Sequence, residues 1–176
     1  LKILDKYPDW KSIIIGEEPR EKLSYIHKNI TNYGQKNHRF ILKKLETTSI
    51  SIICSRWNEP LGRASLEACS RGSVPIITNK GGLPETSKSA IILKDLSVNK
   101  LFKSIETLIL NKSLLTKLQK NNYNEFIFTP EVISKQVDNI RQKLFSTKKI
   151  NFIKNNNKFK ILHITNFNER YNGRLH

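Results

Sequence analysis

The sequence predicts an α/β fold built on a doubly wound, mostly parallel sheet with additional helices at its C-terminal end. Up to residue 93, short apolar runs of strand length alternate with longer segments of helical period, which is the pattern of parallel strands joined by crossover helices. From there to Leu144 the apolar residues recur at helical spacing. We therefore expect a parallel sheet followed by a group of helices.

Five short segments are expected to form the strands of this sheet. The run at 49–55 has the strongest pattern of a buried strand, because β-branched and apolar residues follow one another almost without interruption. Two helices are expected among the strands, at 37–46 and 61–72. The predicted strands, in order, are 11–16, 29–34, 49–55, 74–78 and 90–93.

Three further helices are expected after the last strand, each with its apolar residues on one face. Thr129 and Pro130 should begin the third helix, since Thr is a good N-cap and Pro is well tolerated in the first turn. The apolar positions of the three helices are Leu96, Leu101, Ile105, Leu108 and Ile109; Leu114, Leu115, Leu118 and Phe126; and Val132, Ile133, Val137, Ile140 and Leu144.

The chain of 176 residues is expected to hold one domain at 1–145 and the start of another. Residues 146–158 are rich in Lys and Asn and are predicted to be a linker. The segment 159–176 opens with a strand-like run, which we interpret as the first strand and loop of a second, truncated domain; an extra strand for the first sheet is the alternative. The chain begins with Leu1 and contains no Met, so we expect it to be a piece of a longer protein.

The composition excludes several classes of protein. Hydrophobic residues make up 38% and charged residues 26% of the chain, which argues against a disordered tail, a collagen-like fibre and a disulfide scaffold. The sequence contains no run of about 18 apolar residues, which a membrane-spanning helix would need, and it has no recognisable signal peptide. Cys54 and Cys69 have no metal-ligand spacing, so we expect reduced thiols and a cytoplasmic protein.

The net charge is +16, from 31 Lys and Arg against 15 Asp and Glu, which raises nucleic acid or anionic lipid as a partner. However, 23 of the 31 basic residues are Lys and they are dispersed along the chain. Aromatic residues do not alternate with Arg as a single-strand platform requires. We therefore expect no specific nucleic-acid partner.

The segment 55–68 is the most informative for function, because it joins the end of a strand to the start of a helix, where open α/β sheets bind ligands. Pro60 should pre-set the first helical turn, and Gly62 should allow a ligand close to the backbone. The free amides of residues 61–63 then form an anion site suited to a phosphate. Glu59 and Glu67 flank this site, with Cα atoms about 10 to 12 Å apart if the helix rises about 1.5 Å per residue.

Each carboxylate also has an ordinary structural explanation. Glu67 could form i, i+4 ion pairs with Arg63 and Arg71. Glu59 could complement the helix dipole. Their joint placement around Pro60 and Gly62 favours a ligand site instead.

With its two Glu residues around Pro60 and Gly62, the segment resembles the signature of the retaining, nucleotide-sugar-dependent glycosyltransferases of the GT-B class, the glycosyltransferase group 1 family. The resemblance covers residues 1 to about 145 and corresponds to the Rossmann-like, donor-binding C-terminal half of such an enzyme. Besides the segment itself it rests on 8–16, 29–34, 49–55, 74–77 and 81–85.

This resemblance implies a role for each site residue. Glu59 would contact the transferred sugar at the reacting centre, and Glu67 would bind the ribose hydroxyls. Thr31 and Asn32 would contact the base. Backbone amides of Leu61, Gly62 and Arg63 would hold the diphosphate, while Gly81 and Gly82 would shape a turn.

The resemblance also implies a hexosyltransferase-type activity with retained configuration, no cofactor and no metal ion. Its partners would be a nucleotide-sugar donor, an acceptor glycan or glycolipid and the N-terminal acceptor domain of the same chain, which is missing here. The family's Arg and Lys that neutralise the diphosphate precede the matching segment and cannot be assigned. We therefore expect the piece alone to be nearly inactive, in a protein that builds polysaccharide in the cytoplasm or at the inner membrane face.

A second short resemblance lies in the tail, where 160–165 followed by 172–174 resembles the opening strand and loop of another transferase, which would place two modules in tandem. Two alternatives to the transferase remain open. One is a non-catalytic basic module that binds nucleic acid or an anionic membrane surface, and the other is a GT-B enzyme that splits glycosides with phosphate.

Overall fold

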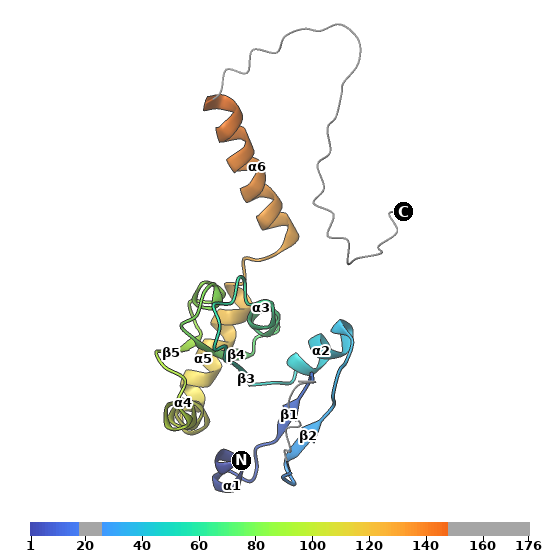
Figure 1. Ribbon diagram of the computed structural model, residues 1–176, viewed down its shortest axis with the longest axis vertical. Helices are drawn as coiled ribbons and strands as arrows, with labels where there is room; N and C mark the ends of the chain where they lie inside the picture. The colour runs from blue at the N-terminus through green and yellow to red at the C-terminus, as the bar shows by residue number, and fades with distance from the viewer. Residues whose placement is uncertain (18–25, 148–176) are drawn as a thin grey trace, which may run out of the picture. The chain divides into compact units, whose positions relative to one another are not determined.

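The computed structural model describes residues 1–17 and 26–147. The chain divides into a unit over Leu1–Ser134 and a second over Lys135–His176. The described strands all belong to the first unit, which also contains the helices that precede α6. The residues that position the candidate site therefore lie in one compact unit (Figure 1).

The strands are parallel and form two ladders. β1 (Ser12–Ile14) pairs with β2 (Ile30–Asn32), and β4 (Val74–Thr78) lies between β3 (Ile50–Ile53) and β5 (Ile91–Leu93). The parallel α/β class predicted from the sequence is thus confirmed. The β4 bounds match the prediction. β1, β2 and β3 are shorter than predicted at both ends, and β5 is shorter only at its start.

The helices follow the predicted order, with one addition. α1 (Lys2–Lys6) precedes the first strand and was not predicted. α2, α3 and the 3-10 helix η1 join the strands. Three helices follow β5 as predicted, except that Leu96 lies before α4 and Phe126 lies after α5. Their bounds are α2 His38–Leu45, α3 Arg63–Ser70, η1 Leu83–Glu85, α4 Val98–Leu110, α5 Lys112–Asn124 and α6 Pro130–Thr147.

Polar side chains cap α2 and α6, and the cap of α6 was predicted from the sequence. The Asn37 side chain accepts a hydrogen bond from the amide of Phe40 at the start of α2, and Thr129 accepts one from the amide of Val132 at the start of α6. These side chains satisfy amides that have no partner within the helix. The predicted role of Thr129 is therefore confirmed.

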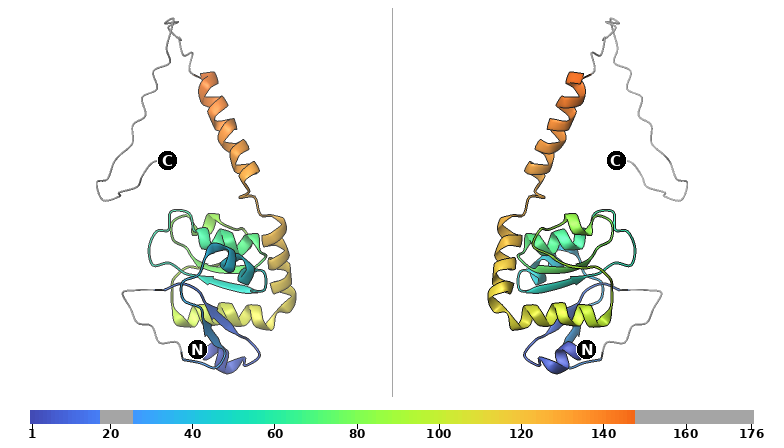
Figure 2. Two further views of the ribbon diagram at one scale, coloured as in Figure 1. Left: turned by 90° about the vertical axis from the view of Figure 1, so that its right-hand side faces the viewer. Right: turned by 90° about the vertical axis from the view of Figure 1, so that its left-hand side faces the viewer.

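The core lies around β4, which is buried along its whole length. Val74 and Ile76 pack with Leu93 of β5 and with apolar residues of α4 and α5. Figure 2 shows α4 and α5 as two successive helices beside these strands. The expectation that 49–55 is the best-buried strand is wrong: Ile52 of β3 is 53% exposed, because β3 has β4 on one side while β4 has a strand on both.

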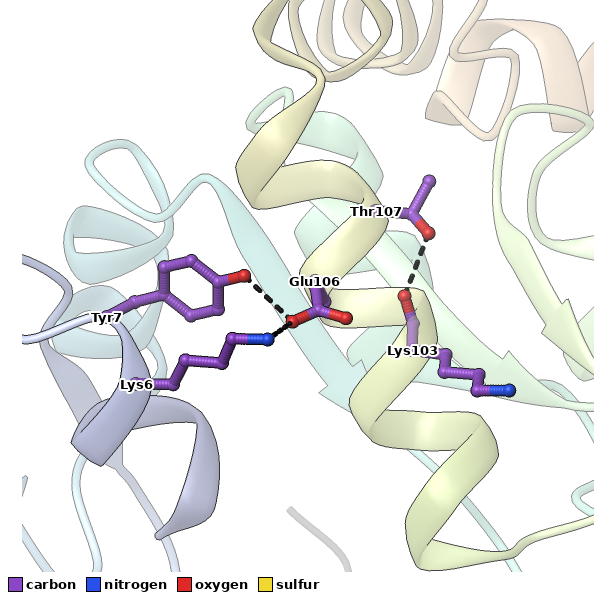
Figure 3. Close-up of polar contacts among 5 residues, drawn as sticks. All are labelled: Lys6, Tyr7, Lys103, Glu106 and Thr107. Atoms are coloured by element: carbon purple, nitrogen blue, oxygen red, sulfur yellow. Dashed lines mark hydrogen bonds and ion pairs between the residues drawn. The ribbon is translucent and has the colours of Figure 1, made fainter.

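An ion-pair cluster joins α1 to α4 (Figure 3). Lys6 Nζ and Tyr7 Oη both donate to Glu106 Oε1, at 2.7 and 2.8 Å. These hydrogen bonds hold the pKa of Glu106 below its ordinary value, and Glu106 raises the pKa of both Lys6 and Tyr7. The unpredicted first helix is thus linked to α4 by one carboxylate, in addition to the burial of Leu4 and the packing of Ile3 and Tyr7 against the core.

Both cysteines are free thiols, as predicted. Cys69 is buried on α3, and burial raises its pKa to about 11. Cys54 is only half-buried, although burial raises its pKa as well.

The predicted boundaries at the C-terminal end fall mostly outside the described residues. Helix α6 continues to Thr147 and so includes the first two residues of the predicted linker 146–158. The rest of that linker and the segment 159–176 lie outside the described part of the chain. Among the helices that are described, none combines the length and apolar content needed to cross a membrane.

Candidate functional site

The loop from β3 to α3 is anchored at its beginning by Thr78 at the end of β4. The Thr78 hydroxyl accepts a hydrogen bond from the amide of Ser55 at 2.9 Å and donates one to the Ser55 carbonyl at 2.8 Å. The Ser55 hydroxyl in turn bonds both the amide and the carbonyl of Trp57. The loop therefore starts at the joined carboxyl ends of two neighbouring strands, and the carboxyl ends of strands are where open α/β sheets bind ligands.

Two glycines hold the Glu59 part of this loop from the opposite side. Gly81 has a φ of +56°, and a Cβ there would lie 2.3 Å from the Glu59 carbonyl oxygen. The amide of Gly82 donates to that same oxygen at 2.7 Å. As predicted, Gly81 shapes a turn; the structure adds that both glycines allow the turn to pack on the backbone of Glu59 and Pro60.

Helix α3 begins at Arg63, two residues later than predicted, with Gly62 as its N-cap. The reason is the left-handed backbone of Gly62, with a φ of +78°, so Pro60 lies in the loop and does not start the helix. A Cβ at Gly62 would lie 2.8 Å from Leu83 and 3.2 Å from Thr86. Gly62 therefore permits close packing on η1, whereas the sequence had suggested close approach of a ligand.

A buried hydroxyl pair completes the junction of α3 with η1. Ser65 Oγ lies 2.7 Å from Thr86 Oγ1, and the Thr86 hydroxyl donates to the Leu83 carbonyl. Ser65, Ala68 and Cys69 form the buried face of α3. Ala64, directly before Ser65 in the helix, is exposed.

Glu67 lies on α3 with its carboxylate 21% exposed. Its Oε1 is 3.2 Å from His38 Nε2, at the start of α2, and 3.9 Å from the Arg63 guanidinium one turn earlier. The expected i, i+4 pair with Arg63 is therefore present. Arg71 instead pairs with Glu46 at the C-cap of α2, at 3.7 Å.

The remaining predicted residues have different surroundings. Glu59 is half-buried, and Leu61 is 50% exposed. Thr31 and Asn32 end β2 and are both exposed. The Asn32 side-chain oxygen accepts a hydrogen bond from the Gly34 amide at 2.9 Å, which shapes the turn that leads toward α2.

The structure thus places the predicted residues in two groups at the carboxyl ends of parallel strands. The first group follows β3 and comprises Glu59, Leu61, Gly62, Arg63 and Glu67, and the second, Thr31 and Asn32, ends β2. The residue that sequence reasoning missed is His38, whose contact with Glu67 connects α2 to α3. No local signal in the sequence identifies this contact, because the two residues are 29 positions apart in the chain.

Two hollows lie away from the β3–α3 loop. One, of about 440 Å³, is lined by residues of 85–89 and 121–128 together with Cys69. The other, of about 530 Å³, lies along α5 beside Lys112, Lys117 and Lys120. Within residues 1–17 and 26–147, no group of three or more His, Cys, Asp or Glu side chains could hold a metal ion.

Two curated relatives from Bacillus subtilis resemble the chain in sequence. It is 25% identical over 172 residues to the protein YtcC, which covers 86% of this chain and 42% of YtcC. It is 34% identical over 110 residues to spore coat protein SA, which covers 53% of this chain and 29% of that protein. The chain therefore spans less than half the length of either relative.

Solved structures show the same fold. The structure of HepE of Anabaena in complex with UDP-glucose is similar to this chain, with a TM-score of 0.65 and 15% sequence identity. The match covers 80% of this chain and 44% of the HepE chain. Sucrose-phosphate synthase from Thermosynechococcus elongatus matches 77% of this chain and 39% of its own with a TM-score of 0.61 and 20% identity. The family described as glycosyl transferases group 1 matches residues 1–125. With its α/β fold and with Glu59 and Glu67 around the start of α3, the chain belongs to the group 1 glycosyltransferase family.

Proposed function

We propose that this domain binds a nucleotide-sugar donor and takes part in transferring its glycosyl group to an acceptor with retention of configuration. The observation that carries the proposal is the arrangement at the start of α3. Glu59 lies in a loop held by Thr78, Gly81 and Gly82, and Glu67 lies one turn beyond the helix start at Arg63. Family membership supports the same assignment and accounts for a motif that a non-catalytic basic module leaves unexplained.

The diphosphate of the donor would bind at the N-terminus of α3. The first amides of a helix have no intrahelical acceptor, and the helix dipole favours an anion there. We assign this role to the amide of Arg63, the first residue of α3, together with the amides of the N-cap Gly62 and of Leu61, which precedes the helix in the loop. The Arg63 side chain is 79% exposed, so it is accessible to a phosphate and could supply part of the positive charge.

The nucleoside would bind beside the diphosphate. Glu67 would accept hydrogen bonds from the ribose hydroxyls, since a carboxylate offers two oxygens to two neighbouring donors. We assign Thr31 and Asn32 to the base. The Asn32 oxygen is engaged with Gly34, so its amide N–H₂ group is the part that would donate to a base carbonyl.

Glu59 would contact the transferred sugar at the reacting centre. In this scheme the departing diphosphate gains negative charge as the glycosidic bond breaks, and preorganised amide donors stabilise that charge in the transition state. The resemblance implies that these donors act without a metal ion or another cofactor. The half-buried Glu59, on a loop fixed by backbone contacts, would need little reorganisation.

The partners belong to the same proposal. The acceptor would be a glycan or glycolipid in polysaccharide synthesis, bound by another domain of the same protein. The domain would act in the cytoplasm or at the inner face of a membrane. Because that other domain would contribute the acceptor side of the reaction centre, the chain by itself would be nearly inactive.

Replacement of Glu67 tests the proposal. In the full-length protein that carries this chain, Glu67→Ala should weaken binding of UDP-glucose, the ligand in the HepE complex, by about tenfold or more. Loss of hydrogen bonds to a charged acceptor costs about 1.5–3 kcal/mol, and 1.4 kcal/mol corresponds to about tenfold in Kd. Isothermal titration with UDP-glucose, and with UDP, GDP and ADP, measures the change.

The matched control is Glu46→Ala. Glu46 is an acid on the same surface region, at the C-cap of α2, and pairs with Arg71. Its replacement should leave nucleotide binding unchanged. Equal affinities of the Glu67→Ala variant and the wild-type protein for every nucleotide would overturn the proposed function.

A further inference from the structure

We propose that His38 is a positioning residue for Glu67, and that it orients the carboxylate toward the ribose of the bound nucleotide. The inference rests on the proposed function of Glu67. It adds a residue from α2, which the sequence motif around α3 does not contain. His38 Nε2 lies 3.2 Å from Glu67 Oε1, whereas His38 and Glu67 are 29 positions apart in the chain.

The contacts of Glu67 are asymmetric. Both His38 and Arg63 approach the same oxygen, Oε1, at 3.2 and 3.9 Å. When Oε1 is held in this way, Oε2 remains available to accept a hydrogen bond from a ligand hydroxyl. Oε1 still has a lone pair that can accept from a neighbouring hydroxyl. The contact therefore fixes the rotation of the carboxylate group without using up its capacity as an acceptor.

The backbone that carries His38 is held at the start of α2, although the His38 side chain itself is 59% exposed. His38 is the first residue of α2, directly after the N-cap Asn37, whose side chain accepts a hydrogen bond from the Phe40 amide at 2.9 Å. Phe40 also packs edge-on against Tyr33, with ring centroids 5.2 Å apart. The imidazole thus extends from a capped and anchored helix end, and Glu67 gains a partner from a different element.

This contact also connects the two groups of site residues. His38 follows Thr31 and Asn32 in the chain, after the turn stabilised by Asn32 and Gly34. Glu67 belongs to the group that follows β3. The pair therefore links the residues proposed to bind the base to the residue proposed to bind the ribose. Base and ribose are the two parts of one nucleoside.

A double-mutant cycle tests this role in the full-length protein. His38→Ala should raise the Kd for the most tightly bound of UDP, GDP and ADP by about threefold to fivefold, as expected for loss of one partly exposed polar contact. In a Glu67→Ala background the same change should alter Kd by less than about twofold, because its partner is already absent. With the sugar donor, His38→Ala should raise KM and leave kcat nearly unchanged.

Two further variants separate positioning from simple stability. His38→Gln, which keeps a side-chain N–H, should restore at least half of the lost binding free energy. Arg39→Ala, at the neighbouring exposed position on α2, should leave Kd unchanged. Equal effects of His38→Ala in the wild-type and Glu67→Ala backgrounds would overturn the inference, and so would no effect in either.

The two proposals fail in different ways. If Glu67→Ala leaves nucleotide binding intact, the proposed function is wrong and the inference falls with it. If Glu67→Ala weakens binding while His38→Ala does not, the proposed function stands and only the role of His38 is wrong.

Discussion

The ladders β1–β2 and β3–β4–β5 are both built from short, Ile-rich parallel strands, yet they differ in burial. Every residue of β4 is buried, whereas β1, β2 and α2 contain no fully buried residue. The core residues of α4 and α5 pack around β4 and β5. Apolar runs therefore identify strands in both places, but the number of neighbouring elements decides which strand becomes the core.

This difference also separates the two parts of the candidate site. The residues proposed for the sugar, diphosphate and ribose follow β3 and are held against the β4–η1 turn by Gly81, Gly82 and Thr78. Thr31 and Asn32, proposed for the base, are exposed at the end of β2. The reacting end of a donor would thus meet the loop that packs on the more buried ladder, and the base would meet the more exposed ladder.

A core substitution in each ladder tests the comparison with the largest expected effect. Ile76→Ala, in fully buried β4, should lower the free energy of unfolding by about 4 kcal/mol, because it removes buried methylene groups and leaves a cavity. Ile14→Ala, in half-buried β1, should lower it by about 1 kcal/mol. Urea unfolding followed by circular dichroism measures both. Similar losses at the two positions would contradict the proposed difference between the ladders.

Glycine substitutions sharpen the comparison at the loops. Gly81→Ala should lower the free energy of unfolding by about 3 kcal/mol, since it combines a left-handed backbone with a clash that the surrounding structure must relieve. The new Cβ would lie 2.3 Å from the Glu59 carbonyl oxygen.

Gly16 is the matched control for this substitution, because its φ is +112° but no atom lies within 4 Å of a Cβ built there. Gly16→Ala should therefore cost only the backbone strain, about 1 kcal/mol. If thermal and urea unfolding show equal costs for the two variants, the Glu59 loop is not held by packing on Gly81.

The smallest expected effect concerns the link between α1 and α4. Glu106→Gln should reduce stability near pH 7 and have little effect below about pH 4. The pKa of Glu106 is lowered in the folded protein, so its contribution is complete above the unfolded pKa and is lost as the pH falls through the folded value. Thermal unfolding from pH 3 to 8 measures it.

The control for this pH dependence is Glu125→Gln, at the exposed C-cap of α5, which should change little across the range. A Glu106→Gln effect that is the same at pH 3 and pH 7 would show that Glu106 acts through packing and not through its charge. In that case the cluster with Lys6 and Tyr7 would not be what holds α1 on the core.

Much of the fold was predictable because its signals are local. The strand at 74–78, the caps Thr129 and Asn37 and the helices after β5 follow from periodicity and capping preferences that act within a few residues. Errors arose where distant segments meet. Helix α3 starts at Arg63, later than predicted, because Gly62 packs on η1. The most buried strand is β4, where we had expected β3, because β4 lies between two other strands.

The candidate site divides in the same way. The motif with Glu59, Gly62 and Glu67 was recognisable, since its spacing is contained in one short segment. The contact of His38 with Glu67 was not, because it joins residues from α2 and α3 whose proximity depends on how the two ladders and their helices pack.

The sequence by itself determined the α/β class, the order of the elements and the family-like motif, since hydrophobic period, turn residues and capping are properties of neighbouring residues. Only the tertiary structure decided which strand is central, where α3 begins, how the glycines hold the Glu59 loop and which side chain meets Glu67. Those features depend on contacts between segments far apart in the chain. The spacing of residues along the sequence does not show which distant segments meet in space.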